Sequence, residues 1–135
     1  MTLQLRTSVL NSRLDIIESD TGASPVLRIR TGTPPLTPAT ADSGTVLATI
    51  TLPADWMSAA AAGVKSKLGT WRDLSADTSG TAGHFRIYES TGTTCYLQGT
   101  VTVTGGGGDM TLDSVAIFVG QSVTVTSFTI TDGNA

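Results

Sequence analysis

The sequence of 135 residues has little of several residue types, and each shortage excludes a class of protein. A single cysteine, Cys95, rules out an internal disulfide, so folding needs no oxidising compartment. Charged residues make up 14% of the chain, and a net charge of −3 argues against a nucleic-acid binder, which would carry a basic surface. No apolar run approaches the roughly 20 residues of a membrane span, and no basic start precedes an apolar segment, so we expect neither a span nor a secretory signal.

Threonine, with 24 residues, and glycine, with 15, are the residue types in excess. Threonine is β-branched and suits the exposed face of a strand, whereas glycine supplies tight turns between strands. The length and the 39% hydrophobic content suit one domain that buries a core without metals or disulfides. The composition therefore predicts a single β-rich domain.

The N-terminal segment departs from this β pattern. Between Leu3 and Ile17, apolar residues recur at spacings of seven, four and three, which is the period of an amphipathic helix. Thr2 suits the N-cap position and Gly22 a stop signal. We expect a helix of about four turns in an arm over residues 1–22, which either packs on the chain's own sheet or contacts a neighbouring subunit.

Residues 23–135 show an apolar period of two, interrupted by turn residues. The strand candidates are 26–30, 45–52, 64–71, 84–89, 95–104, 110–112, 115–119 and 122–131. Between them we expect a helical turn over 59–62, a loop over 77–83 and a mobile loop tip over 105–108. A phase shift in the last strand predicts a bulge near Thr126 or Ser127. About seven or eight short strands favour an all-β fold, a β-sandwich or jelly roll with one N-terminal helix.

Alternation also assigns side chains to the two faces of the central strands. We expect inward-facing side chains at Phe85, Ile87, Cys95, Leu97, Val101 and Val103, with Gly99 in the same register. We expect outward-facing side chains at His84, Arg86, Tyr88, Tyr96, Gln98 and Thr100. The prolines of residues 33–45 cannot continue a strand, so this segment is expected to be an ordered surface loop.

No arrangement of residues favours catalysis. His84 and Cys95 are expected on opposite faces, so Cys95 is interpreted as a buried structural thiol and not as half of a catalytic pair. The glycine run 105–108 lacks the lysine and hydroxyl residue of a phosphate-binding loop, and the aspartates lack calcium-loop spacing. We therefore expect no enzymatic activity, cofactor or metal. Tyr88 and Tyr96 favour a cross-strand pair that stiffens the sheet over a sugar-binding platform.

Four stretches are distinctive as strings: SPVLRIRTG (Ser24 to Gly32), LATITLPADWM (Leu47 to Met57), GTAGHFRIYESTGTTCYLQGTVT (Gly80 to Thr102) and GGGGDMTLD (Gly105 to Asp113). In these, and across nearly the whole chain, the sequence resembles a family of small virion proteins of tailed bacteriophages and prophages. Within that setting, its size and expected fold resemble capsid decoration (cement) proteins, such as the jelly-roll cement protein of a Bordetella phage.

The resemblance implies a structural role on the outer surface of a capsid, after assembly in the bacterial cytoplasm. The implied partners are the major capsid protein and further copies of this chain, as a dimer or trimer, with no nucleic acid or membrane. We expect the contacts on the helix and the proline loop, at Arg6, Leu10, Arg13, Leu14, Ile17, Pro34, Pro35 and Leu36. The alternative is a tail-associated or fibre-associated module that binds a receptor or glycan.

Overall fold

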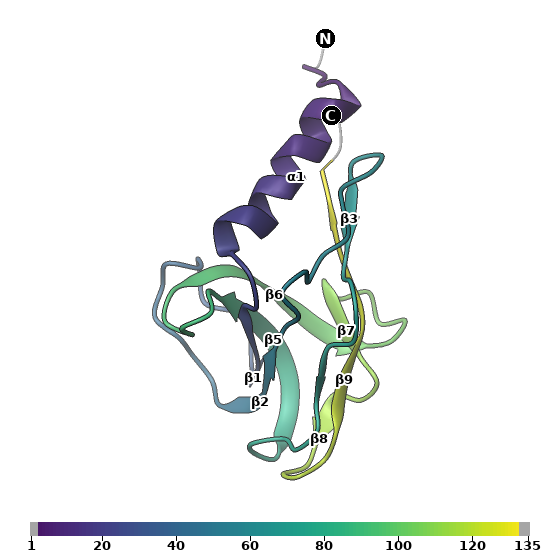
Figure 1. Ribbon diagram of the computed structural model, residues 1–135. Helices are drawn as coiled ribbons and strands as arrows, with labels where there is room; N and C mark the ends of the chain where they lie inside the picture. Colours follow the sequence, from purple (N-terminus) through teal and green to yellow (C-terminus); the bar gives the residue numbers. More distant parts are fainter. Residues whose placement is uncertain (1–2, 133–135) are drawn as a thin grey trace.

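The computed structural model describes residues 3–132 and contains, in that range, one helix followed by nine strands (Figure 1). The helix α1 spans Thr7–Thr21. The strands are β1 (Val26–Thr31), β2 (Val46–Thr51), β3 (Val64–Ser66), β4 (Arg72–Asp73), β5 (Gly80–Tyr88), β6 (Cys95–Val103), β7 (Met110–Leu112), β8 (Ala116–Ile117) and β9 (Val123–Thr131). The expected all-β fold with one N-terminal helix is confirmed, with nine described strands in place of seven or eight.

All nine described strands join one curled sheet. Its order is β2-β1-β5-β6-β7-β9-β3, and β4 pairs with β9 while β8 pairs with β5. The curl brings β2 back toward the segment around β4, where the Thr49 amide donates to Asp73 Oδ2 (3.0 Å) and the Asp77 amide donates to the Leu47 carbonyl (2.8 Å). The apolar faces of the strands therefore enclose one shared core.

Four aromatic rings form the centre of that core. Trp71 lies with its ring centroid 6.1 Å from that of Trp56 and 5.6 Å from that of Phe128. Phe128 meets Phe85 edge to face at 5.4 Å. These rings come from opposite sides of the curl, β5 and β9 among them, so their packing holds the two halves of the sheet together.

The glycine run 105–108, expected to be a mobile loop tip, is joined to the end of β6 by two hydrogen bonds of its backbone. It belongs to a six-residue connection, 104–109, that joins β6 to its parallel neighbour β7. The Gly106 amide donates to the Val103 carbonyl (2.8 Å) and the Gly108 amide to Thr102 Oγ1 (2.9 Å). A Cβ atom at Gly108 would lie 2.9 Å from the Thr102 backbone nitrogen, so a side chain at this position would collide with β6.

Two further expectations about local structure are wrong. Residues 59–62 form no helical turn, because Ala61 and Val64 exchange 2.9 Å backbone hydrogen bonds across a tight hairpin turn. Both turn residues, Ala62 and Gly63, have positive φ angles, as such hairpins require. The segment 77–83 is not all loop, since β5 begins at Gly80 to pair with β8.

The expected bulge in the last strand is confirmed. The pairing of β7 with β9 shifts from Thr111 opposite Ser127 to Leu112 opposite Val125, which leaves Thr126 as the extra residue. The bulge changes which face of β9 points inward, and so both Val125 and Phe128 reach the core.

The helix begins at Thr7 and not at Leu3, and the expected cap Thr2 lies outside the described residues. Gly22 ends it as expected, with φ +89° and its amide donating to the Glu18 carbonyl (2.9 Å). Figure 1 shows α1 projecting from the sheet beside β3 and the end of β9. Because β3 pairs with residues 129–131 of β9, the arm extends beyond the expected residues 1–22. From here on, the arm means α1, β3 and residues 129–131 together.

Buried charge and apolar contacts both attach α1 to β3. Leu10 and Leu14 are buried. The Lys65 ammonium, itself buried, lies 2.7 Å from Asp15 Oδ1 and 2.8 Å from Glu18 Oε2. Burial alone would lower the pKa of Lys65, but the hydrogen bonds from its ammonium to the two carboxylates raise the pKa above its ordinary value.

We predict that Leu14→Ala lowers the free energy of unfolding by about 2–4 kcal/mol, because it leaves a cavity under the helix. Ser8→Ala, a change to the same residue at an exposed position of α1, should alter stability by less than about 0.5 kcal/mol. Urea unfolding followed by circular dichroism measures both. Equal stability of the two variants would contradict the docked position of α1.

Candidate interaction interface

Residues 33–45, the proline loop, cover the outer face of the central strands. Arg86 on β5 reaches up into this loop, with Nη1 2.6 Å from Asp42 Oδ1. Its Nη2 donates to the carbonyls of Pro38 (2.6 Å) and Thr40 (3.0 Å). A guanidinium that is only 1% exposed thus satisfies backbone groups of the loop and holds the loop on the sheet.

Asp42 is the acceptor on which the buried cations converge. Arg30 Nη2 lies 2.9 Å from its Oδ2, and the Tyr88 hydroxyl donates to its Oδ1 at 2.6 Å. Burial alone would raise the pKa of this carboxyl, but the Tyr88 hydrogen bond and the charges of Arg30 and Arg86 outweigh it. The pKa of Asp42 therefore lies below its usual value, and the carboxylate form is favoured.

Further contacts fix both ends of the proline loop, which confirms it as an ordered surface loop. Gln98 Nε2 donates to the Pro35 carbonyl (2.6 Å), and the Thr45 amide donates to Thr31 Oγ1 (2.9 Å). Gly44 has φ +71°, and a Cβ there would lie 2.2 Å from the Thr31 carbonyl oxygen, so the loop returns to β2 through a position that only glycine can occupy.

The expected outward face of β5 is confirmed, but its side chains are not exposed to solvent. His84, Arg86 and Tyr88 do lie on the opposite face from Phe85 and Ile87, but all three are buried under the loop. Burial lowers the pKa of His84, whose Nδ1 lies 2.9 Å from the Gly32 carbonyl oxygen. The neutral ring is therefore favoured, and β5 is covered on both faces.

A bulge overturns the expected inward position of Cys95, whereas Tyr96 is exposed, as expected. The β5–β6 register moves from Ile87 opposite Leu97 to Tyr88 opposite Cys95, which skips Tyr96. Cys95 consequently lies half-buried on the same face as Arg86, where its Sγ accepts from Arg86 Nε at 3.2 Å. Tyr88 is buried while Tyr96 is exposed, so the two rings form no sugar-binding platform. Val103, expected inside, is 46% exposed.

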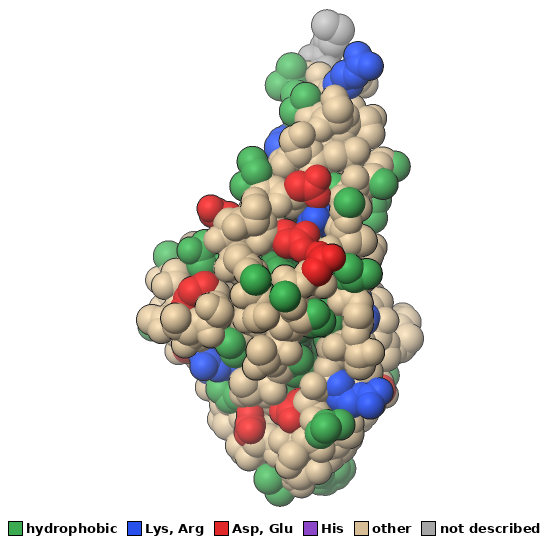
Figure 2. Space-filling view, in the orientation of Figure 1, with side chains coloured by type: hydrophobic (Ala, Val, Ile, Leu, Met, Phe, Trp, Pro, Cys, Tyr) green, Lys and Arg blue, Asp and Glu red, His purple; other side chains and the backbone are tan. Residues whose placement is uncertain are grey.

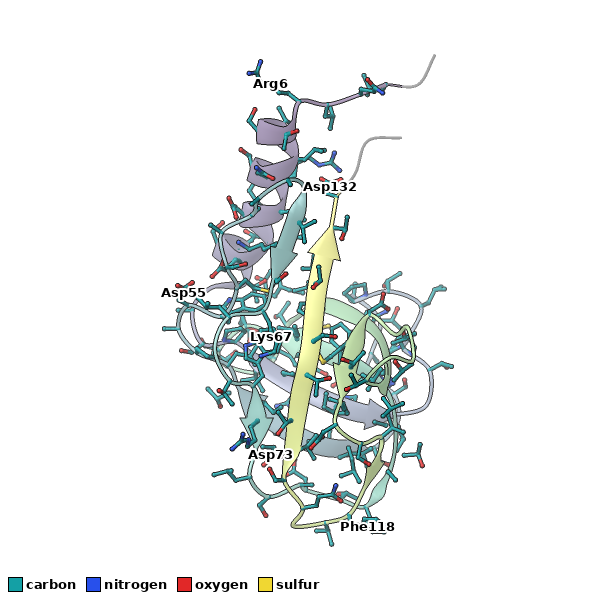
Figure 3. The ribbon with its side chains drawn as sticks, turned by 90° about the vertical axis from the view of Figure 1, so that its right-hand side faces the viewer. Arg6, Asp55, Lys67, Asp73, Phe118 and Asp132 are labelled. Carbon is teal, nitrogen blue, oxygen red and sulfur yellow. The ribbon has the colours of Figure 1, made fainter. Side chains whose placement is uncertain are left out.

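The eight expected contact residues fall into three environments. Leu10 and Leu14 are buried inside the arm, where α1 packs on β3, and Ile17 is half-buried. Arg6 is exposed at the free end of α1, and Arg13 pairs with Asp132 at 3.1 Å (Figure 3). Pro34 and Pro35 are half-buried, whereas Leu36 is 93% exposed. The structure does not bring the two groups, arm and loop, into one surface.

Several exposed apolar and charged groups were not singled out from the sequence. Val9 and Ile16 on α1 are exposed. Phe118 is exposed at the far end of the molecule (Figure 3). Asp15, Glu18 and Asp55 line a cavity of about 560 Å³ at the base of α1, and Figure 2 shows acidic side chains gathered there. Asp42 had one signal in the sequence: it is the only charged residue between Arg30 and Asp55.

Comparisons with protein-family models, with curated proteins and with solved structures found no match. Within residues 3–132, no group of three or more His, Cys, Asp or Glu side chains is placed to hold a metal ion. The described part of the chain also contains no helix of the length and apolarity that crossing a membrane requires.

We predict that Asp42→Asn lowers the free energy of unfolding at pH 7 by about 2 kcal/mol, because it leaves two buried guanidinium groups without their counter-charge. The Asp42 side chain is 39% exposed, so solvent screening keeps the loss below that of a fully buried pair. Urea unfolding at pH 7 measures it, with Asp55→Asn, at an exposed position, as the control.

The same variant gives a pH test. Because the pKa of Asp42 is lowered on folding, its contribution is present above its unfolded pKa of about 4 and is lost as the pH falls through the folded pKa. The stability difference between the wild type and Asp42→Asn should therefore shrink steadily below about pH 4. A difference that stays constant down to about pH 2 would contradict the role of the ionised carboxylate.

Proposed function

We propose that this chain is a structural virion protein that binds the outer surface of a bacteriophage capsid and stabilises the shell. One observation carries the proposal: the proline loop is held rigidly by buried charged groups, and it presents Leu36 almost fully to solvent beside half-buried Pro34 and Pro35. A rigid apolar projection loses little conformational entropy when it enters a pocket of a partner protein.

The virion setting rests on the resemblance of the four sequence stretches. The acidic, charge-poor composition supports it, since a net charge of −3 disfavours adhesion to packaged nucleic acid. A capsid also offers many equivalent sites, so one modest contact per copy is sufficient when hundreds of copies act on the same shell.

Binding can be tested with particles of the encoding phage from which this protein has been removed. We predict that Leu36→Asp lowers the affinity of the purified chain for these particles at least about tenfold, because an apolar contact is lost and a charge is desolvated. Leu74→Asp, the same change at a leucine that is 75% exposed and lies outside the proline loop, should bind as the wild type does. Co-sedimentation measures both variants.

Copy number separates the proposal from its alternative. Quantitative mass spectrometry of intact particles should give hundreds of copies, in a simple ratio to the major capsid protein. Three, six or twelve copies would instead assign the chain to the tail or fibre, and equal binding of Leu36→Asp and Leu74→Asp would remove the proline loop as the contact.

A further inference from the structure

On the side away from β3, the helix α1 carries two further apolar side chains that are exposed. Val9 and Ile16 are 44% and 61% exposed, and their separation of seven residues places them about two turns apart on one side of the helix. Ile16 also lines a cavity of about 240 Å³, together with Ile17, Tyr96 and Leu97. An apolar stripe therefore runs along the helix and ends in a hollow against β6.

The charges of α1 are arranged against its own dipole. Arg6 lies at the N-cap, where the helix dipole is positive, and Glu18 and Asp20 lie in the last turn, where it is negative, whereas Arg13 and Asp15 lie near the middle of the helix. Figure 2 shows the same separation, with basic side chains toward the free end of the arm and acidic ones toward its base. This order destabilises an isolated helix by a few tenths of a kcal/mol per charge.

Within the part of the chain that the structure describes, most of these charges are neutralised, but two are not. Arg13 pairs with Asp132, while Asp15 and Glu18 share Lys65. Among residues 3–132, the side chains of Arg6 and Asp20 have neither a hydrogen bond nor an ion pair. Arg6 is the N-cap residue of α1, three residues before Val9, and Asp20 lies four residues after Ile16 on the same side of the helix, so the two charges flank the apolar pair about 21 Å apart along the axis.

We propose that two copies of this chain form a dimer by packing this stripe of α1 against itself in the antiparallel direction. A two-fold axis between Ser12 and Arg13 places Val9 of one copy opposite Ile16 of the other. The same register brings Arg6 to within one residue of the level of Asp20 in the second copy. Each contact occurs twice, which gives two apolar pairs and two ion pairs from one self-complementary surface.

Three features of the arm suit this arrangement. The antiparallel direction also opposes the two helix dipoles, so it compensates the unfavourable charge order of each helix. Ser12 at the centre is small and exposed, and Arg13 beside it is already paired with Asp132, so two like charges need not face each other unpaired. The side of α1 away from β3 stands clear of the sheet over most of its length, so the two β domains lie at opposite ends of the pair (Figure 1).

The expected dimer is weak. The shared strip is about 22 Å long and about 10 Å wide per copy, which is less than the roughly 800 Å² per partner of a standard interface. We expect a dissociation constant on the order of 10–100 μM that rises with salt, because two of the four contacts are exposed ion pairs. The dimer does not depend on the virion role, and a chain that never meets a capsid would still form it.

Charge reversal tests both whether a second copy of the chain is the partner and whether the two α1 helices pack antiparallel. Sedimentation velocity of the full chain at about 1–500 μM should show a monomer–dimer equilibrium for the wild type. Arg6→Glu and Asp20→Lys should each weaken it at least about tenfold, because each places like charges together twice. An equimolar mixture of the two variants should restore the affinity. In the mixed dimer the two introduced charges, which are opposite in sign, face each other, and the native Arg6 of one copy faces the native Asp20 of the other.

Controls and contrary outcomes complete the experiment. Asp55→Lys, a charge reversal at an exposed aspartate off the stripe, should dimerise as the wild type does, whereas Ile16→Asp should remain monomeric. Circular dichroism checks that every variant is folded. A wild type that is monomeric at about 500 μM would overturn the proposal, as would single reversals without effect. A mixture that fails to restore the dimer would overturn the antiparallel register.

Discussion

The carboxylate of Asp42 is the group on which the outer half of this structure depends. It accepts from Arg30, Arg86 and Tyr88, and so it allows two guanidinium groups to be buried on one face of a sheet whose other face forms the apolar core. Without a counter-charge, the cost of desolvating those cations would exceed what the proline loop contributes by covering them. The protein thus has two interiors, one apolar and one polar, separated by the thickness of β5.

This double burial marks the limit of what the sequence could predict. Period-two alternation correctly separated Phe85 and Ile87 from His84 and Arg86, because strand geometry alone decides which face a side chain occupies. It could not predict that the polar face would be covered. That depends on the proline loop, which lies far from β5 in the sequence and whose single charged residue, Asp42, pairs with both Arg30 and Arg86. The bulge at Thr126 was predictable from a phase shift in hydrophobicity, whereas the bulge that moved Cys95 leaves no such trace.

The glycine run shows a similar limit for backbone packing. Four consecutive glycines are typical of a flexible loop, yet here the run lies against β6 because a short parallel connection forces the chain back along the strand that it has just left. The glycine content predicts that the segment is flexible in the unfolded chain, but its position in the folded protein follows from the parallel pairing of β6 and β7. The helix shows the same limit. Leu10 and Leu14 follow the helical period and are buried where α1 packs on β3, whereas the apolar residues Val9 and Ile16 are exposed.

A weak dimer through the arm and a capsid contact through the proline loop would reinforce each other. When both protomers of a pair meet a lattice, the second loop binds at an effective concentration set by the rigid arm and not by the bulk solution. Two contacts that are each modest can then hold a protein tightly on a shell, provided that the spacing of the loops matches that of the sites. The rigidity of the proline loop and the docked helix are what such matching requires, because flexible attachments would spread the loops over many spacings and lower that concentration.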